Sequence, residues 1–497
     1  MPETPAPPQN ESTTDRRAVP IFGLGQQQRS PFISTVKRVN AVVELTENGR
    51  QQAAVVGLPG LVTLMTLGDL PCRAIFSISD TLTFYVITGD QIIRASVNQT
   101  PVVLGTLTTN TGPAWIDSNG TQLFINDGVT AMIYTLATQT ITQISDADYP
   151  VGAAGGTFLQ GRFWVYVPVG VSAQSGRVYG SAQYDGLAWD ALDFFTPEAV
   201  PDGIVGVTRW FNDLVIFGHQ SIEWWSGSPS TLLGALGFAP ITGASTEVGL
   251  VAPQGFAGTN QTLFFLGHSN GSTGVYKLTG YSAVKVSTPS IDDELAMRPT
   301  AASAICTAYM VGGHPIFQVT LPHDQAANAL TIIYDAGTEL WSWRETLTKP
   351  YYTGLLATSH SDAVYITDAF TGLISQMVET VYTENGNPMV FEVSSMHLLK
   401  EGDRLAVNEI QVDCEVGVSP STGQGSDPQA MIQVSKDAGH TWVAERWAGM
   451  GKIGKYRWRA IRRRIGASRD LAIRFRITDP IPRRITGAYV RLSGGVS

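Results

Sequence analysis

One unit recurs along most of this chain: a short β-forming run, a turn rich in Gly, Asn or Asp, and a second β-forming run. Examples are DTLTFYVITGDQIIRASV (80–97), GTQLFINDGVTAMIYTL (120–136) and NDLVIFGHQSIEWWSG (212–227). Successive units begin roughly 40–50 residues apart, which is the period of a four-stranded propeller blade. The repeat predicts an all-β fold built on a β-propeller of about six or seven blades. Two irregular offsets indicate unequal blades, and a set of β-sandwiches is the competing architecture.

The pattern changes in the C-terminal part, where strands become longer and alternate strictly between apolar and arginine side chains in 455–466 and 471–478. Such alternation predicts a sheet with one buried and one solvent-facing side. The predicted buried face consists of Tyr456, Trp458, Ala460, Leu471, Ile473, Phe475 and Ile477. The predicted outer face carries Arg457, Arg459, Arg474 and Arg476.

Three segments are therefore expected. Residues 1–22, rich in Pro, Thr and Glu and without apolar periodicity, form a flexible arm. Residues 23–379 form the propeller-like body, and the 51 glycines of the chain suit its many turns. Residues 380–497 form an appended β-sandwich with an arginine-rich face, to which strands from 30–50 are candidates to contribute.

Charge is distributed unevenly. Residues 436–497 hold 15 basic and 4 acidic residues, a net charge of +11, while the rest of the chain carries −20. An acidic body argues against a protein that grips nucleic acid over its whole surface, because phosphate contacts need cations. The arginines of the basic segment could meet phosphates, pair with an acidic surface of a neighbouring subunit, or form a solvated face. We favour a subunit interface, with the candidates Arg457, Arg459, Arg462, Arg463, Arg464, Arg474 and Arg476.

Gly267-His268-Ser269-Asn270-Gly271 matches the G-x-S-x-G pattern of serine hydrolases. A nucleophile elbow needs a strand before the serine and a helix after it. Here the following residues, STGVYKLTG, read as a second strand, and Asn270-Gly271 is a strong hairpin signal. We therefore predict a blade hairpin with Ser269 at its tip, and no catalytic residue.

Other candidate sites are weak. The histidines and acidic residues that could act together are His219, His268, His314, His323 with Asp324, and the predicted loop cluster Asp292, Asp293 and Glu294. None has metal-ligand spacing, and Cys72, Cys306 and Cys414 form no CxxC pair, so no metal, cofactor or disulfide is expected. SKDAGHTW (435–442) matches the Asp-box hairpin known from sialidases, which is a fold element remote from catalysis.

Residues 197–227, PEAVPDGIVGVTRWFNDLVIFGHQSIEWWSG, resemble a signature of the packaged-DNA stabilisation proteins of short-tailed bacteriophages, also called tail hub, nozzle or tail accessory proteins. The matching positions include Pro201, Asp202, Gly203, Gly206, Phe217, Gly218, Glu223 and Trp224. The segments 29–61 and 458–492 are similar to the family as well. The resemblance therefore covers both ends and the middle of the chain.

This resemblance implies a structural virion protein without enzyme activity. It would form a homohexameric ring below the portal and adaptor rings, extend the DNA channel, retain packaged double-stranded DNA and hold tail fibres or spikes and the distal tip. It would be made in the host cytoplasm and reside in the virion tail. No membrane segment is expected, since the most apolar window, 53–68, is short and broken by Pro59-Gly60. The alternatives are a glycan- or receptor-binding propeller and a sialidase-like glycosidase.

Overall fold

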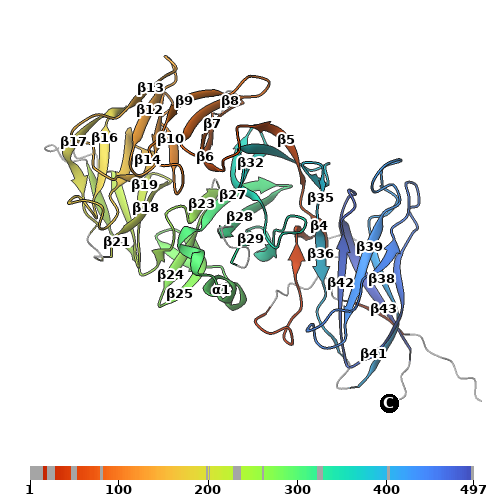
Figure 1. The fold of residues 1–497 in the computed structure, drawn as a ribbon. Helices are drawn as coiled ribbons and strands as arrows, with labels where there is room; N and C mark the ends of the chain where they lie inside the picture. The colour runs from red at the N-terminus through yellow and green to blue at the C-terminus, as the bar shows by residue number, and fades with distance from the viewer. Residues whose placement is uncertain are drawn as a thin grey trace, which may run out of the picture. The chain divides into compact units, whose positions relative to one another are not determined.

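The computed structural model of the chain describes residues 15–19, 28–45, 53–78, 82–197, 200, 202–227, 237–259, 262–321, 328–399 and 403–493. The chain divides into two compact units (Figure 1). The propeller unit comprises Gly60–Glu339 and Arg344–Glu379. The sandwich unit comprises Met1–Pro59, Leu340–Trp343 and Thr380–Ser497.

Seven blades of paired β-strands make up the described part of the propeller unit, so the predicted propeller is confirmed. In chain order, the first four contain β6 (Cys72–Ser77), β7 (Thr83–Thr88), β8 (Gln91–Ser96) and β9 (Val102–Thr106); β10 (Trp115–Ser118), β11 (Gln122–Asn126), β12 (Ala131–Thr135) and β13 (Thr140–Gln143); β14 (Ala154–Leu159), β15 (Arg162–Tyr166), β16 (Val178–Ala182) and β17 (Asp185–Phe195); and β18 (Ile204–Trp210), β19 (Asp213–Gly218), β20 (Ile222–Gly227) and β21 (Phe238–Thr246).

The last three blades contain β22 (Gly249–Leu250), β23 (Phe256–Thr259), β24 (Thr262–Ser269), β25 (Ser272–Thr279) and β26 (Ser282–Lys285); β27 (Ile305–Val311), β28 (His314–Leu321) and β29 (Leu330–Asp335); and β31 (Gly354–His360), β32 (Ala363–Asp368), β33 (Leu373–Val378) and β5 (Gly60–Thr66). The helix α1 (Pro289–Ala296) and a 3-10 helix (Pro299–Ser303) connect the fifth blade to the sixth.

The middle strands of the blades are apolar on both faces because each blade packs between two neighbours. Phe124 in β11 stacks on Phe163 in β15 of the next blade, with 5.4 Å between ring centroids. Phe195 in β17 stacks in turn on Trp225 in β20, at 4.1 Å. Two-sided burial explains why β15 reads as the nearly unbroken apolar run RFWVY.

The ring of blades closes with a strand from the beginning of the propeller unit. β5 precedes the first blade in sequence, yet it pairs antiparallel with β33 of the last blade. First and last blades also pack together, since Phe84 in β7 meets Tyr365 in β32 edge-on at 4.9 Å. Opening the ring would therefore separate both a strand pair and a packed core.

The sandwich unit has two sheets, which supports the predicted appended sandwich. One sheet has the order β3 (Ala41–Leu45), β4 (Ala53–Gly57), β43 (Arg484–Ser493), β38 (Leu405–Cys414) and β41 (Ala460–Ser468), and β1 (Asp15–Ala18) also pairs with β43. The other has the order β30 (Leu340–Trp343), β2 (Arg38–Val39), β36 (Phe391–Ser394), β42 (Asp470–Ile477), β39 (Gln429–Ser435) and β40 (Arg446–Gly449), and β37 (Leu398–Leu399) also pairs with β42. The short strands β34 (Thr383–Glu384) and β35 (Asn387–Pro388) precede β36.

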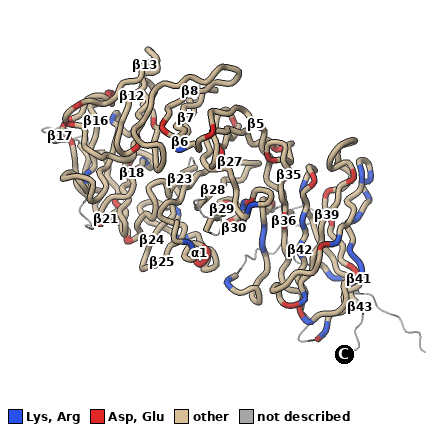
Figure 2. The backbone as a smooth tube through the Cα atoms, viewed as in Figure 1, with Lys and Arg blue, Asp and Glu red and all other residues tan. Residues whose placement is uncertain are grey.

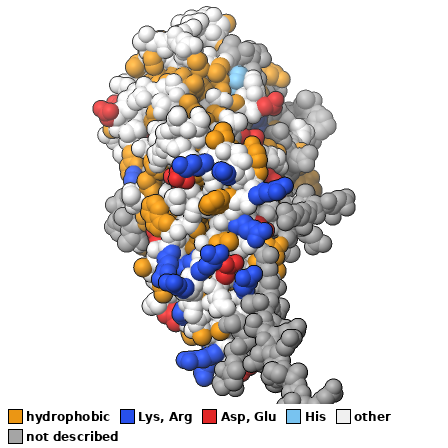
Figure 3. Space-filling view, turned by 90° about the vertical axis from the view of Figure 1, so that its right-hand side faces the viewer, with side chains coloured by type: hydrophobic (Ala, Val, Ile, Leu, Met, Phe, Trp, Pro, Cys, Tyr) orange, Lys and Arg blue, Asp and Glu red, His pale blue; other side chains and the backbone are white. Residues whose placement is uncertain are grey.

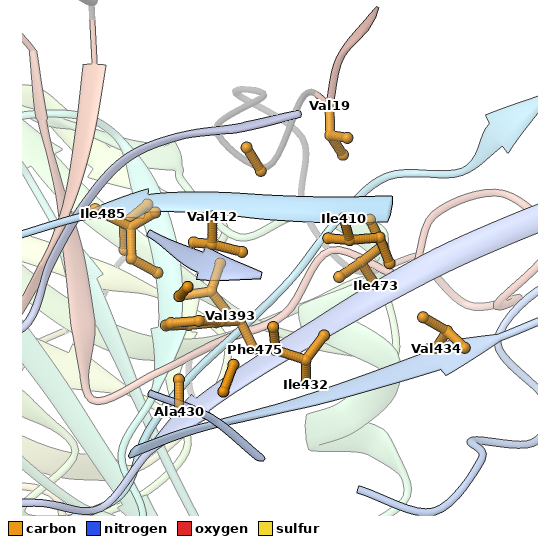
Figure 4. Close-up of a cluster of buried hydrophobic side chains, with 14 of the residues drawn as sticks. Val19, Val393, Ile410, Val412, Ala430, Ile432, Val434, Ile473, Phe475 and Ile485 are labelled. Atoms are coloured by element: carbon orange, nitrogen blue, oxygen red, sulfur yellow. The ribbon is translucent and has the colours of Figure 1, made fainter. Parts of the chain in front are cut away.

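Apolar side chains from both sheets form one core (Figure 4). Ile410 and Val412 come from the first sheet, and Ile432, Ile473 and Phe475 from the second. These residues are at most 1% exposed. Alternation along β38, β39 and β42 places them all on the inner face, as the sequence predicts for Ile473 and Phe475.

Two N-terminal segments differ from the expectation. Asp15–Ala18 forms β1 on β43 and Val19 is buried in the sandwich core, where part of a flexible arm over 1–22 was expected. The other residues of that arm, 1–14 and 20–22, lie outside the described residues. The strands β2 and β3 lie within 30–50, where strands were candidates to complete the sandwich, whereas β4 lies in the expected propeller body. All three belong to the sandwich unit, because Val43 and Val55 pack into its core.

The alternation of residues 455–459 predicts that they belong to the strand β41. In the structure, β41 begins only at Ala460. Gly451 and Gly454 adopt φ values of 83° and 82° and turn the chain. The Nε1 of Trp458 then donates to the carbonyl O of Gly449 at 2.8 Å. Tyr456 and Trp458 are consequently 70% and 51% exposed instead of buried.

Candidate interaction surface and signature motif

The seven candidate arginines do not share one face. Arg462 lies on the inner face of β41 with Ala460 and is only 7% exposed. Its Nη1 donates to the carbonyl O of Ile432 in the opposite sheet at 2.6 Å. Burial, followed by the nearby charge of Arg446, lowers the pKa of Arg462. Arg462 therefore links the two sheets and is unsuited to bind a partner.

Arg474 and Arg476 lie on the outer face of β42, as predicted, but they form ion pairs within the unit. The Nη2 of Arg476 is 2.6 Å and the Nε of Arg474 is 3.3 Å from the carboxylate of Glu392. Arg476 also lies 3.4 Å from Glu445, and the Arg474 guanidinium stacks 4.0 Å from the Trp442 ring. These two arginines are therefore largely neutralised in the isolated chain.

The remaining candidates, Arg457, Arg459, Arg463 and Arg464, are exposed. Arg463 reaches Glu409 at 2.9 Å. Arg464 has a φ of 60° and lies where β41 slips in register against β38. Figure 2 shows Lys and Arg gathered on the C-terminal strands, and Figure 3 shows them interspersed with hydrophobic side chains.

Three exposed aromatic residues, Trp447, Tyr456 and Trp458, form what we call the aromatic patch. Trp447 is 67% exposed on β40, and Trp458 covers Gly449 two residues further along the same face. The alternation in 455–466 predicts Tyr456 and Trp458 in the core, and Trp447 lies outside that pattern. The glycines at 451 and 454 were the available signal, since they interrupt the alternation.

The family signature builds the turn between β19 and β20. The Asp202 carboxylate accepts hydrogen bonds from the Gln220 amide at 2.5 Å and from the Ser221 hydroxyl at 3.1 Å. A Cβ at Gly218 would lie 2.6 Å from Asp202 Oδ2, so this position must be glycine for the carboxylate to fit. The signature aspartate and glycine thus have a structural role.

The other signature positions pack the fourth blade. Phe217 stacks on Phe256 of the fifth blade at 5.5 Å, and a Cβ at Gly206 would lie 2.9 Å from Leu250. The buried Glu223 accepts a hydrogen bond from Trp225 Nε1 at 3.1 Å. Gly203 has a φ of 77°, Trp224 is fully buried, and Pro201 lies outside the described residues.

Ser269 lies in a β-hairpin, as the Asn-Gly signal predicts. β24 ends at Ser269 and β25 begins at Ser272, with φ values of 50° at Asn270 and 77° at Gly271. The Ser269 hydroxyl donates to the carbonyl O of Glu247 at 3.3 Å. A strand follows the serine where a nucleophile elbow requires a helix, so the G-x-S-x-G match does not build one.

The Asp-box also folds as a capped turn. The Asp437 carboxylate accepts hydrogen bonds from the Thr441 hydroxyl at 2.5 Å and the Thr441 amide at 2.9 Å. The Ser435 hydroxyl donates to it at 2.7 Å. These hydrogen bonds, led by that of the Thr441 hydroxyl, lower the pKa of Asp437 to about 2.

The histidine and carboxylate candidates are dispersed. His314 Nδ1 lies 2.7 Å from the Asp335 carboxylate, and His219 and His268 lie at separate positions on the fourth and fifth blades. The acidic cluster lies in the helix α1 and not in the expected loop. Its members form separate ion pairs, Asp292 with Lys285 at 2.6 Å and Glu294 with Arg298 at 2.7 Å.

No group of three or more His, Cys, Asp or Glu side chains suited to hold a metal ion occurs in the part of the chain that the structure describes. His323 and Asp324 lie outside that part. Burial raises the pKa of both Cys72 and Cys414 to about 12, so these thiols are poor nucleophiles. Among the described helices, none is long and apolar enough to cross a membrane.

Fold and sites together define an all-β protein with a propeller and an appended sandwich, in which the signature residues form turns and packing contacts. Two family models match it in the same order. "Bacteriophage P22 Gp10, beta-propeller" matches residues 17–382, and "Bacteriophage P22 Gp10, beta-sandwich" matches residues 391–493. The chain therefore belongs to the Gp10 family of bacteriophage P22.

A curated relative is the tail hub protein gp10 of Salmonella phage P22, which is 24% identical over 315 residues. The match covers 60% of this chain and 62% of that protein, less than two thirds of its length. Among solved structures, the WD40 domain of Neurospora crassa Pan2 is 10% identical, with 67% of this chain and 97% of that one covered and a TM-score of 0.39. The extracellular domain of BT4673 from B. thetaiotaomicron is also 10% identical, with coverages of 64% and 39% and a TM-score of 0.39. Scores this low carry no argument about function.

Proposed function

We propose that this chain is a structural tail hub protein in the virion of a short-tailed phage. The observation that carries the proposal is the match of both units, in order, to the two domains of the Gp10 family, one member of which is a tail hub protein. The hydrogen bonds of Ser269, Asp202 and Asp437 support a structural protein over an enzyme, since each hydroxyl or carboxylate already bonds another part of the fold.

In this proposal six copies form a ring below the portal and adaptor rings of the tail. The ring extends the DNA channel, helps to retain packaged double-stranded DNA, and anchors tail fibres or spikes and the distal tip. The propeller unit supports a channel role because it has 25 acidic and 10 basic residues, a net charge of −15. Like charge would let DNA pass without static binding. The chain would be synthesised in the host cytoplasm.

The test is the number of copies of this chain per particle. Purified virions are digested, and peptides of this chain and of the portal protein are quantified by mass spectrometry against isotope-labelled standards. A six-fold ring under a twelve-fold portal gives about one copy for every two portal subunits. Absence from the virion would contradict the proposal and would direct attention to glycan-binding and glycosidase assays.

A further inference from the structure

The aromatic patch lies in a segment of the sandwich unit that is rich in exposed apolar side chains. Between 443 and 458, five large hydrophobic residues are exposed by 38% to 70%: Val443, Trp447, Ile453, Tyr456 and Trp458. Most apolar side chains on a protein surface are scattered singly, and a contiguous cluster marks an interaction site. Trp and Tyr are also the residue types most enriched at binding hot spots.

The patch is built on an ordered loop. The Gly454 amide donates to the Gly417 carbonyl O at 3.0 Å, and the Lys455 and Trp458 amides close two further turns at 3.0 and 3.1 Å. A Cβ at Gly451 would lie 2.8 Å from Trp458, so the indole packs directly on the backbone. A preorganised aromatic surface loses little conformational entropy on binding.

Exposed basic residues, which we call the cationic rim, alternate along the chain with the residues of the aromatic patch. The rim consists of the exposed residues Arg446, Lys452, Lys455, Arg457 and Arg459. Among the described ion pairs, the rim takes part in one, between Lys452 and Asp427 at 3.4 Å, and both side chains are more than half exposed. The rim therefore differs from Arg474 and Arg476, whose charge is already met by Glu392.

We propose that the aromatic patch and its cationic rim dock onto the acidic propeller unit of a second copy of this chain. Charge complementarity selects this occupant, since the propeller unit carries −15 while the sandwich unit carries +6, from 23 basic and 17 acidic residues. A contact between two different surfaces of identical chains is head-to-tail and closes into a ring when the rotation permits. The inference rests on the proposed function for its ring, and it names the surface that joins neighbouring copies.

Aromatic and cationic side chains together also suit single-stranded nucleic acid, whose bases stack on aromatic rings. The bases of double-stranded DNA are already stacked on one another and offer no free faces to Trp447 or Trp458. A protein partner is therefore favoured, and a nucleic-acid adduct becomes one outcome of the test.

Photo-cross-linking identifies the molecule that contacts the aromatic patch directly. Trp447 is replaced by benzoylphenylalanine in the full chain, and virions carrying it are irradiated. The matched control carries the same probe at Leu399, an apolar residue of the sandwich unit outside the aromatic patch, which is 62% exposed. We expect a covalent dimer of this chain from position 447, joined to a peptide from within 60–339 or 344–379. An adduct within one copy, to another virion protein, to DNA, or no adduct would overturn the proposal.

Substitution tests the same surface by assembly. Trp447→Glu should reduce ring formation, measured by native mass spectrometry, by at least about tenfold, as hot-spot aromatics do. Arg457→Glu with Arg459→Glu should weaken it without removing any packed side chain, and Leu399→Glu, outside the patch, should leave it unchanged. Thermal unfolding confirms that the variants are folded. Normal assembly of both patch variants would refute the inference.

The two proposals fail in different ways. Hub stoichiometry in the virion together with a position-447 adduct to a different protein would remove only the docking inference. Absence of the chain from virions would remove the proposed function. In that case, the same cross-link on the purified chain would still decide whether two copies meet through the patch.

Discussion

Glu392 is a nearly buried carboxylate, 5% exposed, that holds two arginines on the outer face of a sheet. The antiparallel register places Glu392 opposite Arg476, and the alternation along β42 places Arg474 on the same face. A carboxylate buried to this extent is tolerated only when its charge is met, and here two guanidinium groups do so. The surface charge of this sheet therefore depends chiefly on Glu392, with Glu445 as a second partner of Arg476 at 3.4 Å.

Removing that carboxylate should destabilise the sandwich. Glu392→Ala leaves two like-charged, half-buried arginines without their shared partner, and we expect a loss of about 1–3 kcal/mol, less than for a fully buried pair because both guanidinium groups reach solvent. Urea denaturation measures the change. Arg463→Ala is the control, because its side chain is 72% exposed and its ion pair with Glu409 should contribute under about 1 kcal/mol. Equal losses in both variants would contradict this account.

Asp437 should make the Asp-box turn sensitive to acid. Its pKa is lowered to about 2 in the folded chain, from an ordinary value of about 3.9. A carboxyl group whose pKa is lower in the folded chain stabilises the fold fully at pH values above its pKa in the unfolded chain. This stabilisation is lost as the pH falls to the pKa of the folded chain, here between about pH 4 and pH 2. Asp437→Asn should lower the unfolding temperature at neutral pH, and the difference from wild type should shrink across that window.

The matched control for this titration is Asp427→Asn, since Asp427 is exposed and pairs only across 3.4 Å with Lys452. Its unfolding temperature should follow that of the wild type at every pH. A difference between wild type and Asp437→Asn that stays constant down to about pH 2 would mean that the carboxylate charge is not what stabilises the turn.

At the scale of single elements, the β19–β20 turn depends on Asp202 and Gly218, because only a glycine at 218 leaves room for the Asp202 carboxylate. Asp202→Ala removes two hydrogen bonds from the turn and should cost about 1–2 kcal/mol. Gly218→Ala forces the same carboxylate away and should cost a similar amount. The double variant should cost clearly less than the sum, because the carboxylate is lost only once.

The double-mutant cycle is read by chemical denaturation. Gly105→Ala is the control glycine, since a Cβ there would meet its neighbours at 3.4 Å or more, which is ordinary contact. Strict additivity of Asp202→Ala and Gly218→Ala would show that the two positions act independently, and the signature would then need another explanation.

Local signals in the sequence were sufficient for elements whose partners are close along the chain. The hairpin around Ser269 follows from Asn270-Gly271, and the blades follow from strands joined by short turns. Strand β1 could not be found this way, because Asp15–Ala18 pairs with residues near the other end of the chain and carries no alternation of its own. Arg462 was misplaced because a residue type alone does not reveal that its guanidinium meets a carbonyl in the opposite sheet.

At the scale of the whole molecule, the sequence predicted the order of the two architectures but not their boundaries. The sandwich unit combines three distant stretches of the chain, and the propeller unit is closed by β5, which lies before its first blade. Such long-range pairings are invisible to a pattern that is read in short windows. The charge difference between the units is nevertheless a property of sequence, and it becomes informative only once the units are known.

The difference in net charge between the propeller unit and the sandwich unit predicts how assembly of the proposed ring should respond to salt. Complementary charge speeds encounter more than it strengthens the final contact, while the aromatic patch supplies apolar burial that salt does not screen. Raising the salt from about 0.05 M to about 0.5 M should therefore slow assembly markedly yet leave most rings intact at equilibrium. Light scattering follows the rate, and native mass spectrometry follows the endpoint. Rings that dissolve fully in high salt would mean that the cationic rim, and not Trp447 and Trp458, holds neighbouring copies together.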